Sequence, residues 1–268
     1  MPVFDEKLFV GPWYGEFGHE IMFVAMARAE AKKYSRTIAC SYPSSAALYA
    51  DFADEFVPHR FRCCGVVATA TAETQPSASE LACLVPPGCT RWPGVEHRGD
   101  RATVCHRYGK RRPEYEGVVV VHARNRPHVA ARNWPARLWH KLAREMYRER
   151  ICTQIICVGL REHAFAVEGA LDLRSAPLEQ QMDAMASARF AVGPSSGPMH
   201  LAQHCGCPVV VWCGGGSVER ARTQARYVKN WNPFGAPGRI FQYAGWQPTY
   251  ERVRDEVLAL IAFLEKSE

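Results

Sequence analysis

The sequence predicts an α/β protein whose sheets are mostly parallel and covered by helices. Segments with strand character alternate with segments of helical periodicity along most of the chain, as in βαβ units. Several strand segments are unbroken runs of apolar residues, which is expected for strands buried on both faces. The chain has 268 residues, 47% of them apolar, enough for the core of one large domain or two small ones.

The first part of the chain predicts the order strand, helix, strand, helix. Residues 7–13 are strand-like, and apolar residues recur at helical spacing from 19 to 34. Residues 36–42 predict a second strand, and 44–50 a short helix that begins with two serines. Between 60 and 113, Pro, Gly, Cys and Thr interrupt every pattern, so neither elements nor a role follow from the sequence there.

The second part predicts a small, complete, doubly wound domain. Its strands are expected at residues 116–124, 151–159, 189–193 and 207–214, and its helices at 134–150, 176–188 and 198–206. An amphipathic helix at 250–266 closes the chain. We therefore expect domains at 1–113 and 114–246, followed by a C-terminal helix at 247–268.

Composition limits the class of protein. There are 33 Lys and Arg against 27 Asp and Glu, a net charge of +6, which suits a phosphate-bearing ligand and is compatible with nucleic acid. The 11 cysteines lie in apolar surroundings without the spacing of a disulfide framework, so they are expected to be free thiols. No leader segment is evident and no apolar run reaches the ~20 residues of a membrane span, so we expect a cytoplasmic protein without one.

The stretch VGPSSGPMHLAQHCGCPVVVWCGG, residues 192–215, is typical of an anion site. A buried strand ends at Gly193, a Pro-Ser-Ser-Gly turn follows, and a helix begins whose first amides lack partners within the helix. These amides, the helix dipole and the hydroxyls of Ser195 and Ser196 would hold a phosphate, with Gly197 allowing close approach. Alternatively, Ser195 only caps the helix and His200 is a core histidine.

The segment from Val118 to Gly215 resembles the donor-binding half of the heptosyltransferase-like glycosyltransferases of the GT-B fold. The resemblance rests on APLEQQMDAMASARFAVGPSSGPMHLAQHCGCPVVVWCG, on VGLREH, and on VHARNRPHVAARNWPARLWHKLA, in matching order. It departs at Ser195, where the family usually has an acidic residue, and in the short N-terminal half. It implies two facing Rossmann-like domains, with the C-terminal helix packing back across.

This resemblance implies a metal-independent, inverting glycosyltransferase that moves a sugar from a nucleotide-sugar donor to an acceptor hydroxyl, with no cofactor. Glu16, between two glycines at the start of a helix, is the expected general base, with His19 second and Glu20 orienting it. Alternatively, the two glutamates only complement the helix dipole. The donor would be held by the set Arg124, Arg126, Arg132, Ser195, Ser196, Gly197 and His200. The acceptor would contact Trp13, Tyr14, Arg111 and Arg112.

Other interpretations remain open. Residues 91–112 carry seven basic and two acidic side chains, which indicates either a solvated linker or a surface for phosphate or nucleic acid. The second case suggests DNA with a hydroxymethylated base as the acceptor, while a glycan or a small molecule also remains open. Residues 220–235 either cover the donor or form a packed loop. The protein could also be a non-catalytic nucleotide-binding module.

Two further classes are disfavoured. The run HLAQHCGC contains His200, His204, Cys205 and Cys207, but no second ligand pair with zinc spacing is evident, so no metal site is expected. No Gly-x-Gly-x-x-Gly follows the first strand, which argues against a dinucleotide-dependent dehydrogenase.

Overall fold

The computed structural model describes residues 4–61, 76–92, 105–127, 129–215 and 224–266. The chain forms two compact units, Met1–His106 and Arg107–Glu268. The division falls between His106 and Arg107, whereas the sequence suggested a boundary after residue 113. The last helix belongs to the second unit. Both units have a parallel sheet with helices, which confirms the α/β fold class.

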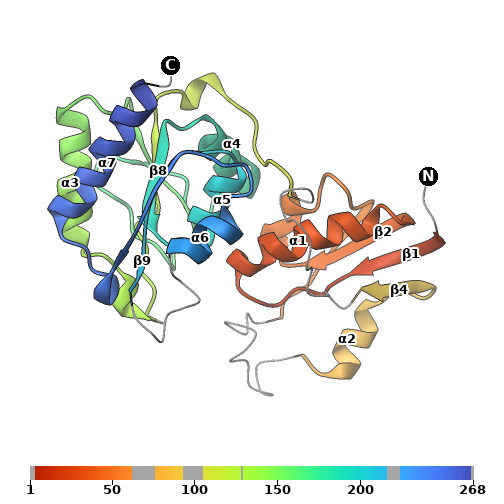
Figure 1. Ribbon diagram of the computed structural model, residues 1–268. Helices are drawn as coiled ribbons and strands as arrows, with labels where there is room; N and C mark the ends of the chain where they lie inside the picture. The colour runs from red at the N-terminus through yellow and green to blue at the C-terminus, as the bar shows by residue number, and fades with distance from the viewer. Residues whose placement is uncertain (1–3, 62–75, 93–104, 128, 216–223, 267–268) are drawn as a thin grey trace. The chain divides into compact units, whose positions relative to one another are not determined.

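The first unit is built on a four-stranded parallel sheet with the order β3-β2-β1-β4. Its elements are β1 (Phe4–Val10), α1 (Phe17–Ala31), β2 (Tyr34–Ser41), β3 (Glu55–Pro58), α2 (Ala78–Leu84) and β4 (Cys89–Trp92), with a 3₁₀ helix η1 at Pro43–Leu48. Figure 1 shows α1 lying along the sheet. The buried side chains of Phe9, Ile38 and Cys40 pack with Leu84 of α2.

The second unit is built on a six-stranded parallel sheet with the order β10-β9-β8-β5-β6-β7. Its strands are β5 (Val119–Val121), β6 (Ile155–Cys157), β7 (Leu171–Asp172), β8 (Phe190–Pro194), β9 (Val209–Gly214) and β10 (Gly238–Tyr243). The chain proceeds outward from β5 through β6 to β7, then returns to the other side of β5 at β8. The order therefore reverses between β5 and β8, where the carboxyl ends of strands in such sheets bind ligands.

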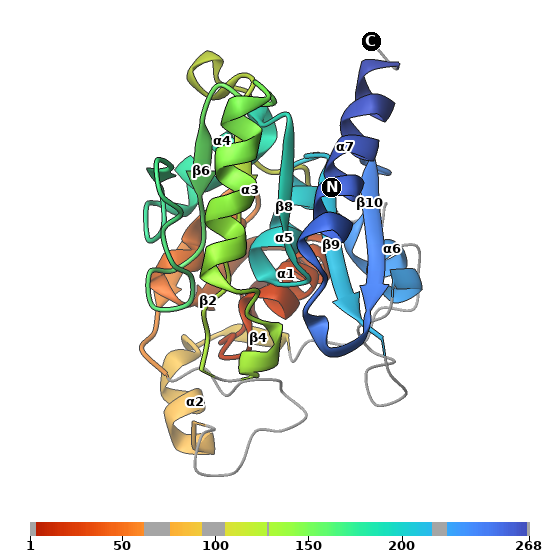
Figure 2. The same cartoon turned by 90° about the vertical axis from the view of Figure 1, so that its left-hand side faces the viewer.

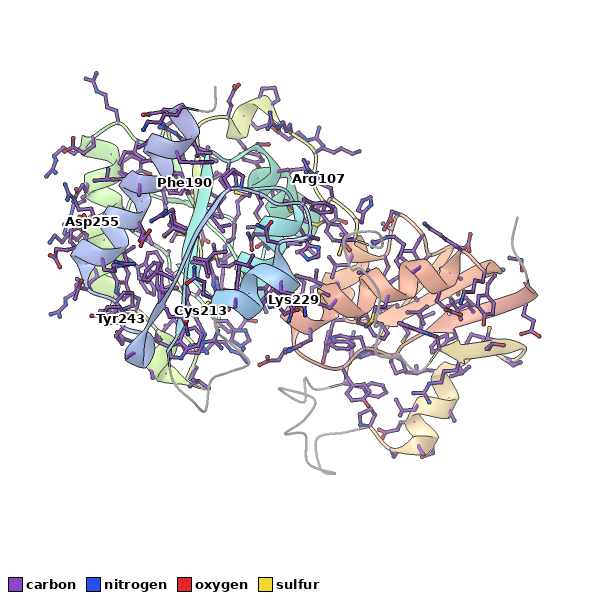
Figure 3. All side chains as sticks on the ribbon, in the orientation of Figure 1. Arg107, Phe190, Cys213, Lys229, Tyr243 and Asp255 are labelled. Atoms are coloured by element: carbon purple, nitrogen blue, oxygen red, sulfur yellow. The ribbon has the colours of Figure 1, made fainter. Side chains whose placement is uncertain are left out.

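Helices cover both faces of this second sheet. They are α3 (Ala136–Arg148), α4 (Leu178–Ser187), α5 (Gly197–His204), α6 (Gln224–Trp231) and α7 (Tyr250–Glu265). Figures 1 and 2 show α3 and α7 side by side on one face, with α4 and α5 on the other. Figure 3 shows Phe190 inside this unit and Asp255 on the outer side of α7.

The core between the sheet and the α3–α7 face contains Trp134, Trp139, Trp212 and Trp246. The rings of Trp134 and Trp139 meet edge to face at 5.0 Å between centroids, and each lies 5.6 Å from Trp212 of β9. These three rings are at most 1% exposed. Because Trp134 lies two residues before the start of α3, this cluster fixes the loop between β5 and α3 as well as the helix.

Several element boundaries expected from the sequence are wrong. The first helix ends at Ala31 because Tyr34 already begins β2, and residues 43–48 form a 3₁₀ helix rather than an α-helix. The sequence analysis missed β3, α2, β4, β7, α6 and β10. Each is short, with at most eight residues, so a periodicity has little length in which to develop.

Candidate functional site

The carboxyl ends of β5 and β8 meet through two side chains. His122 directly follows β5, and Ser196 lies two residues beyond β8. The Oγ of Ser196 is 2.8 Å from Nδ1 of His122. This hydrogen bond bridges the point at which the strand order reverses, so it marks the position where the fold favours a ligand.

The first turn of α5 lies beside this bridge. Ser196 is the N-cap residue, yet its side chain accepts no hydrogen bond from its own helix. Ser195, which the sequence suggested as a cap, is 6% exposed, and its amide donates to the carbonyl of Trp212. Since no side chain caps α5, its first amides and its positive dipole end remain suited to an anion.

Arginines from the loop between β5 and α3 approach the same place. Arg132 donates through Nη2 to the carbonyl of Ser195, and its guanidinium lies 4.3 Å from the ring centroid of Trp246. Arg124 is 3% exposed and donates to the side chain of Asn133 and to the carbonyl of Val129 at 3.1 Å. Both cations are therefore held by fixed contacts, which orients them before any ligand arrives.

Asn133 organises this loop. Its Oδ1 also accepts from the amide of Arg126 at 3.1 Å, and its Nδ2 donates to the carbonyl of Arg126 at 2.8 Å. Arg126 is thereby fixed through its backbone. The sequence analysis missed Asn133 and also His122, although His122 is a polar residue that directly follows a buried strand and Asn133 lies three residues before the start of α3.

The imidazole of His122 is neutral at ordinary pH. Burial, together with the nearby charges of Arg124 and Arg132, lowers its pKa to about 3. The same pair of arginines that disfavours a positive imidazole favours a bound anion. The site therefore combines a neutral hydrogen-bonding ring with fixed positive charge.

His200, expected from the sequence to contact the donor, lies inside the unit. It is 8% exposed, and its ring stacks on Trp231 of α6 with 3.8 Å between centroids and 3° between planes. Its Nε2 is 3.4 Å from Oγ of Ser195. His200 therefore contacts the turn through Ser195 and contacts α6 through Trp231, so α6 is packed against α5. Residues 220–223 of the stretch expected to cover the donor lie outside the described residues.

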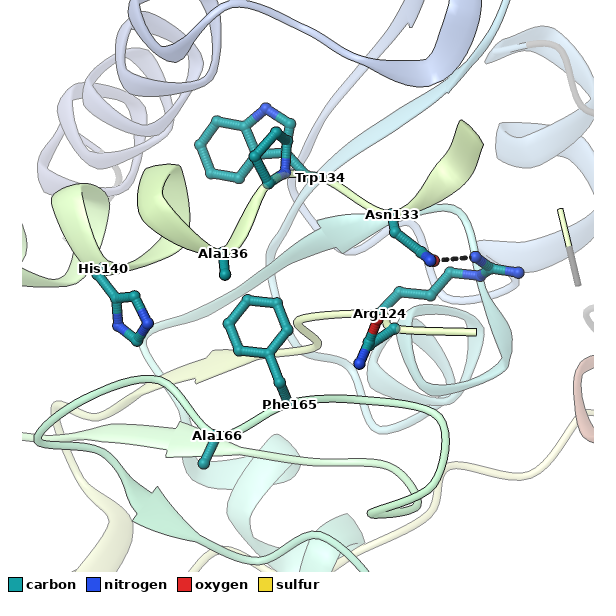
Figure 4. Close-up of a pocket in the computed structure, with 9 residues that line it drawn as sticks. Arg124, Asn133, Trp134, Ala136, His140, Phe165 and Ala166 are labelled. Atoms are coloured by element: carbon teal, nitrogen blue, oxygen red, sulfur yellow. Dashed lines mark hydrogen bonds between the residues drawn. The ribbon is translucent and has the colours of Figure 1, made fainter. Parts of the chain in front are cut away.

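A pocket of about 490 Å³ lies at the same edge of the sheet, on the α3 side. Figure 4 shows Phe165, on the loop after β6, pointing towards Ala136 and His140 of α3, with Arg124 and Asn133 at one end of the pocket. The residues that line it are Arg124, Asn125, Asn133, Trp134, Pro135, Ala136, His140, Phe165 and Ala166. Its volume lies in the range of small-molecule sites, and its lining combines apolar side chains with the polar side chains of Arg124, Asn125, Asn133 and His140.

The backbone builds the pocket floor. The amide of Asn125 donates to the carbonyl of His163 at 2.7 Å, and that of Phe165 donates to the carbonyl of Ala123 at 3.0 Å. The loop after β6 is thereby attached to the segment that carries Arg124. No pattern in the sequence places Phe165 at this pocket, because its position depends on the hydrogen bonds between the two loops.

In the first unit, Glu16 and His19 lie at the start of α1. Glu16 is the N-cap residue, and its Oε2 is 3.9 Å from Nδ1 of His19. Their side chains are 23% and 49% exposed. A carboxylate and an imidazole with access to solvent are thus within reach of one another, an arrangement suited to proton transfer.

Glu20 does not orient His19, contrary to the expectation from the sequence. It is fully buried and accepts hydrogen bonds from Ser41, from Ser45 at 2.8 Å and from Tyr49 at 3.0 Å. Burial raises its pKa to about 7, although the three hydroxyls act in the opposite direction. Glu20 therefore connects α1 to the end of β2 and to η1.

The residues expected to contact the acceptor are divided between the two units. Trp13 and Tyr14 follow β1 and are partly exposed, with the ring of Trp13 4.9 Å from that of Phe23. Arg112, by contrast, belongs to the second unit and pairs with Asp183 of α4 at 2.8 Å. Arg111 is exposed on the same segment. Residues 93–104 of the basic stretch lie outside the described residues.

Among the residues that the structure describes, no three His, Cys, Asp or Glu side chains gather as a potential metal site. None of the helices found there is long and apolar enough to cross a membrane.

Solved structures similar to this chain are glycosyltransferases. The ADP-heptose LPS heptosyltransferase II of E. coli is 15% identical, with a TM-score of 0.57 over 97% of this chain and 99% of that one. A family 9 glycosyl transferase from Veillonella parvula is 11% identical, with a TM-score of 0.61 over 98% and 99%. The heptosyltransferase WaaC of E. coli with ADP-2-deoxy-2-fluoro heptose is 13% identical, with a TM-score of 0.50 over 98% and 99%.

These similarities span nearly the whole chain, not only the donor-binding half in which the sequence motifs lie. No model of a protein family matches the sequence, and no curated protein matches it. At these levels of identity, the common feature is the arrangement of strands and helices. The chain has the α/β fold of the heptosyltransferase-like, GT-B glycosyltransferases.

Proposed function

We propose that the protein is a glycosyltransferase that moves a sugar from a nucleotide-sugar donor to an acceptor hydroxyl. The observation that carries this proposal is the uncapped first turn of α5 at the reversal of strand order, with Arg132 fixed on the carbonyl of Ser195. The likeness of the whole chain to solved glycosyltransferases supports it at the level of the fold.

The diphosphate of the donor occupies the N-terminus of α5 in this proposal. The amides of Gly197 and Met199, with the hydroxyl of Ser196, donate to its oxygens, whereas Pro198 between them has no N–H. Arg132 and Arg124 balance the negative charge that grows on the leaving diphosphate as the glycosidic bond breaks. We propose that these groups act without a metal ion.

The nucleoside of the donor extends into the pocket beside Arg124. The pocket shares Arg124 and the 124–133 loop with the anion site, so one ligand can contact both. Phe165 and Pro135 provide apolar surface for a flat ring. This assignment predicts that a nucleoside diphosphate binds more tightly than inorganic pyrophosphate.

Glu16 in the first unit acts as the general base. It takes the proton of the acceptor hydroxyl while the acceptor oxygen forms a bond to the anomeric carbon and the diphosphate leaves with the electron pair of the broken bond. Attack opposite the leaving group inverts the anomeric centre. His19, 3.9 Å from Glu16, accepts the proton in turn.

The first test is a thermal-shift series on the purified protein with UDP, GDP, ADP and CMP and their sugar conjugates, because a ligand of the folded state raises Tm. A shift with one nucleotide that disappears in Arg132→Gln supports the donor site. The absence of a shift with every nucleotide would contradict the proposal.

Glu16→Gln separates an enzyme from a nucleotide-binding module. If Glu16 is the base, sugar transfer falls by about 100-fold or more while the nucleotide shift is unchanged. Unchanged transfer would remove Glu16 from the mechanism, and a nucleotide shift without turnover of any donor would favour the module.

DNA with a hydroxymethylated base is one acceptor within this proposal. Its support is the basic stretch at residues 91–112, within which Arg112 is already paired with Asp183. Retention on duplex DNA that weakens with salt and with Arg111→Gln supports this acceptor. No retention at low salt contradicts it.

A further inference from the structure

His59 connects the ends of three neighbouring strands in the first unit. It directly follows β3, and its amide donates to the carbonyl of Ser41, the last residue of β2, at 2.9 Å. Its Nε2 is 2.6 Å from the carbonyl oxygen of Trp13, which lies beyond the end of β1. The side chain is buried, and its ring lies 4.9 Å from that of Tyr42 and 4.8 Å from that of Phe61.

The two ring nitrogens of His59 have fixed and different roles. A carbonyl oxygen only accepts, so Nε2 must carry the hydrogen in the contact with Trp13. The amide of Phe61 donates to Nδ1 at 3.1 Å, so Nδ1 must carry none. Only the neutral ring with its hydrogen on Nε2 satisfies both contacts, and burial, which lowers the pKa of His59, favours this form.

The segment held by His59 carries Glu16. The amide of Trp13 donates to the carbonyl of Cys40 at 3.0 Å, so the N–H and the C=O of this residue are both fixed. At the other end of the segment, the carbonyl of Glu16 accepts from the amides of His19 and Glu20 in α1. Tyr14 and Gly15 alone separate the two fixed points. The direction of Glu16 thus depends on the peptide that His59 holds.

We infer that His59 is a positioning residue, which orients Glu16 by fixing the carbonyl of Trp13 through its Nε2–H. The link to catalysis rests on the proposed function, whereas the effect on the segment does not. His59 itself does not contact the substrate. The bond to Trp13, rather than the volume of the ring, is what the role requires.

Two substitutions separate these contributions. In His59→Gln the side-chain amide nitrogen falls near the position of Nε2 and can donate to Trp13. In His59→Asn the shorter side chain places an oxygen near the position of Nδ1, which can accept from Phe61 but cannot reach Trp13. Both variants lose the ring, so packing loss is common to the pair.

Hydrogen–deuterium exchange of a peptide spanning residues 11–18 is the primary readout. We expect exchange of the amide of Trp13 to rise about tenfold or more in His59→Asn and to stay near the wild-type rate in His59→Gln. A peptide from α3 in the second unit serves as the internal control. Equal exchange in the two variants, whether raised or unchanged, would overturn the inference.

The tautomer gives an independent check that needs no variant. Nitrogen-15 NMR of the histidine rings at pH 7 should show His59 as the neutral Nε2–H form. A charged ring or an Nδ1–H form would overturn the inference even if both variants fail to fold.

Activity connects the inference to the proposed function. With a donor identified, His59→Asn should lower kcat while KM for the donor stays unchanged, and His59→Gln should restore most of kcat. Equal kcat in the two variants would overturn the positioning role. Failure of the wild type to bind any nucleotide would instead reject the proposed function, leaving the exchange and tautomer results intact.

Discussion

The Oγ of Ser196 lies 2.8 Å from Nδ1 of His122, although the two residues are 74 positions apart in the sequence. A serine at a helix N-cap ordinarily gives its oxygen to the amides of its own helix, and this one contacts a neighbouring strand end instead. The amides at the start of α5 are therefore kept for another partner. This arrangement supports the proposal that the turn at 194–197 binds an anion.

Ser196→Ala should reduce nucleotide affinity. In the proposed site the hydroxyl donates to the diphosphate, so we expect Kd to rise about tenfold. The variant also loses the hydrogen bond to the buried ring of His122, so we expect the free energy of unfolding to fall by about 1 kcal/mol. Titration calorimetry and urea unfolding measure the two effects.

Thr249→Ala is the matched control for Ser196→Ala. The side chain of Thr249 accepts from the amide of Arg252 and caps α7. Its loss should cost about 1 kcal/mol of stability and leave Kd unchanged. If Thr249→Ala raised Kd as much as Ser196→Ala does, the loss of affinity would follow from lower stability and not from a contact between Ser196 and the nucleotide.

Arg132→Lys should behave as a strongly impaired variant despite keeping its charge. Lysine does not reproduce the planar contact with Trp246 together with the bond to the carbonyl of Ser195. We expect nucleotide affinity to fall about tenfold or more in Arg132→Lys, and further in Arg132→Gln. Arg144→Gln, an exposed charge on α3, controls for net charge. Equal Kd values for Arg132→Lys and the wild type would show that only charge matters.

The sequence predicted the fold where elements are long and buried, and failed where they are short. The run VVVV and the helix around Trp139 are recognisable alone, because one apolar period extends through each. β10 was missed because GRIFQY becomes a strand by pairing with β9, a contact that no local pattern contains. The irregular stretch after residue 60 concealed β4 for the same reason.

The position of the candidate site in the fold could be predicted from the sequence, but most of the contacts between its side chains could not. The Pro-Ser-Ser-Gly turn and the nearby arginines were identified, because strand ends and helix starts can be read from the sequence. The contact of His122 with Ser196 joins two distant segments, and the contact of Asn133 with Arg124 depends on how the loop between β5 and α3 folds, so neither could be predicted from the sequence. Glu20 was misassigned because its position on α1 says nothing of the hydroxyls that β2 and η1 bring to it.

The buried His122 should make the protein less stable in acid. Its pKa is about 3 in the folded protein and near the ordinary 6.5 when unfolded, so the unfolded chain binds the additional proton between these values. Stability from this residue is complete above pH 6.5 and is lost as the pH falls, at roughly 1.4 kcal/mol per pH unit below about 6.

Urea unfolding of wild type and His122→Asn between pH 5 and 7.5 measures this effect. His59, His106 and His163 also have lowered pKa values, so the wild-type slope alone is not specific. The difference between the two proteins isolates His122, and we expect it to shrink as the pH falls. A difference that is constant with pH would mean that His122 titrates normally in the folded protein.

Glu20 should produce the opposite pH dependence in the first unit. Burial raises its pKa to about 7 from the ordinary 4.5, so the folded protein binds the additional proton between these values. The stability contributed by the protonated carboxyl is complete below pH 4.5 and is lost as the pH rises through 7, on the order of 3 kcal/mol in total. Glu20→Gln keeps an oxygen for the hydroxyls of Ser45 and Tyr49 but cannot ionise. We therefore expect the free energy of unfolding of Glu20→Gln to increase relative to that of the wild type as the pH rises from 5 to 8.

Tyr49→Phe removes one of the hydroxyls that stabilise the ionised form of Glu20. In this variant the free energy of unfolding should fall more steeply than in the wild type over the same pH range. A difference between Glu20→Gln and wild type that is equal at pH 5 and pH 8 would show that the three hydroxyls fully compensate the burial of the charge.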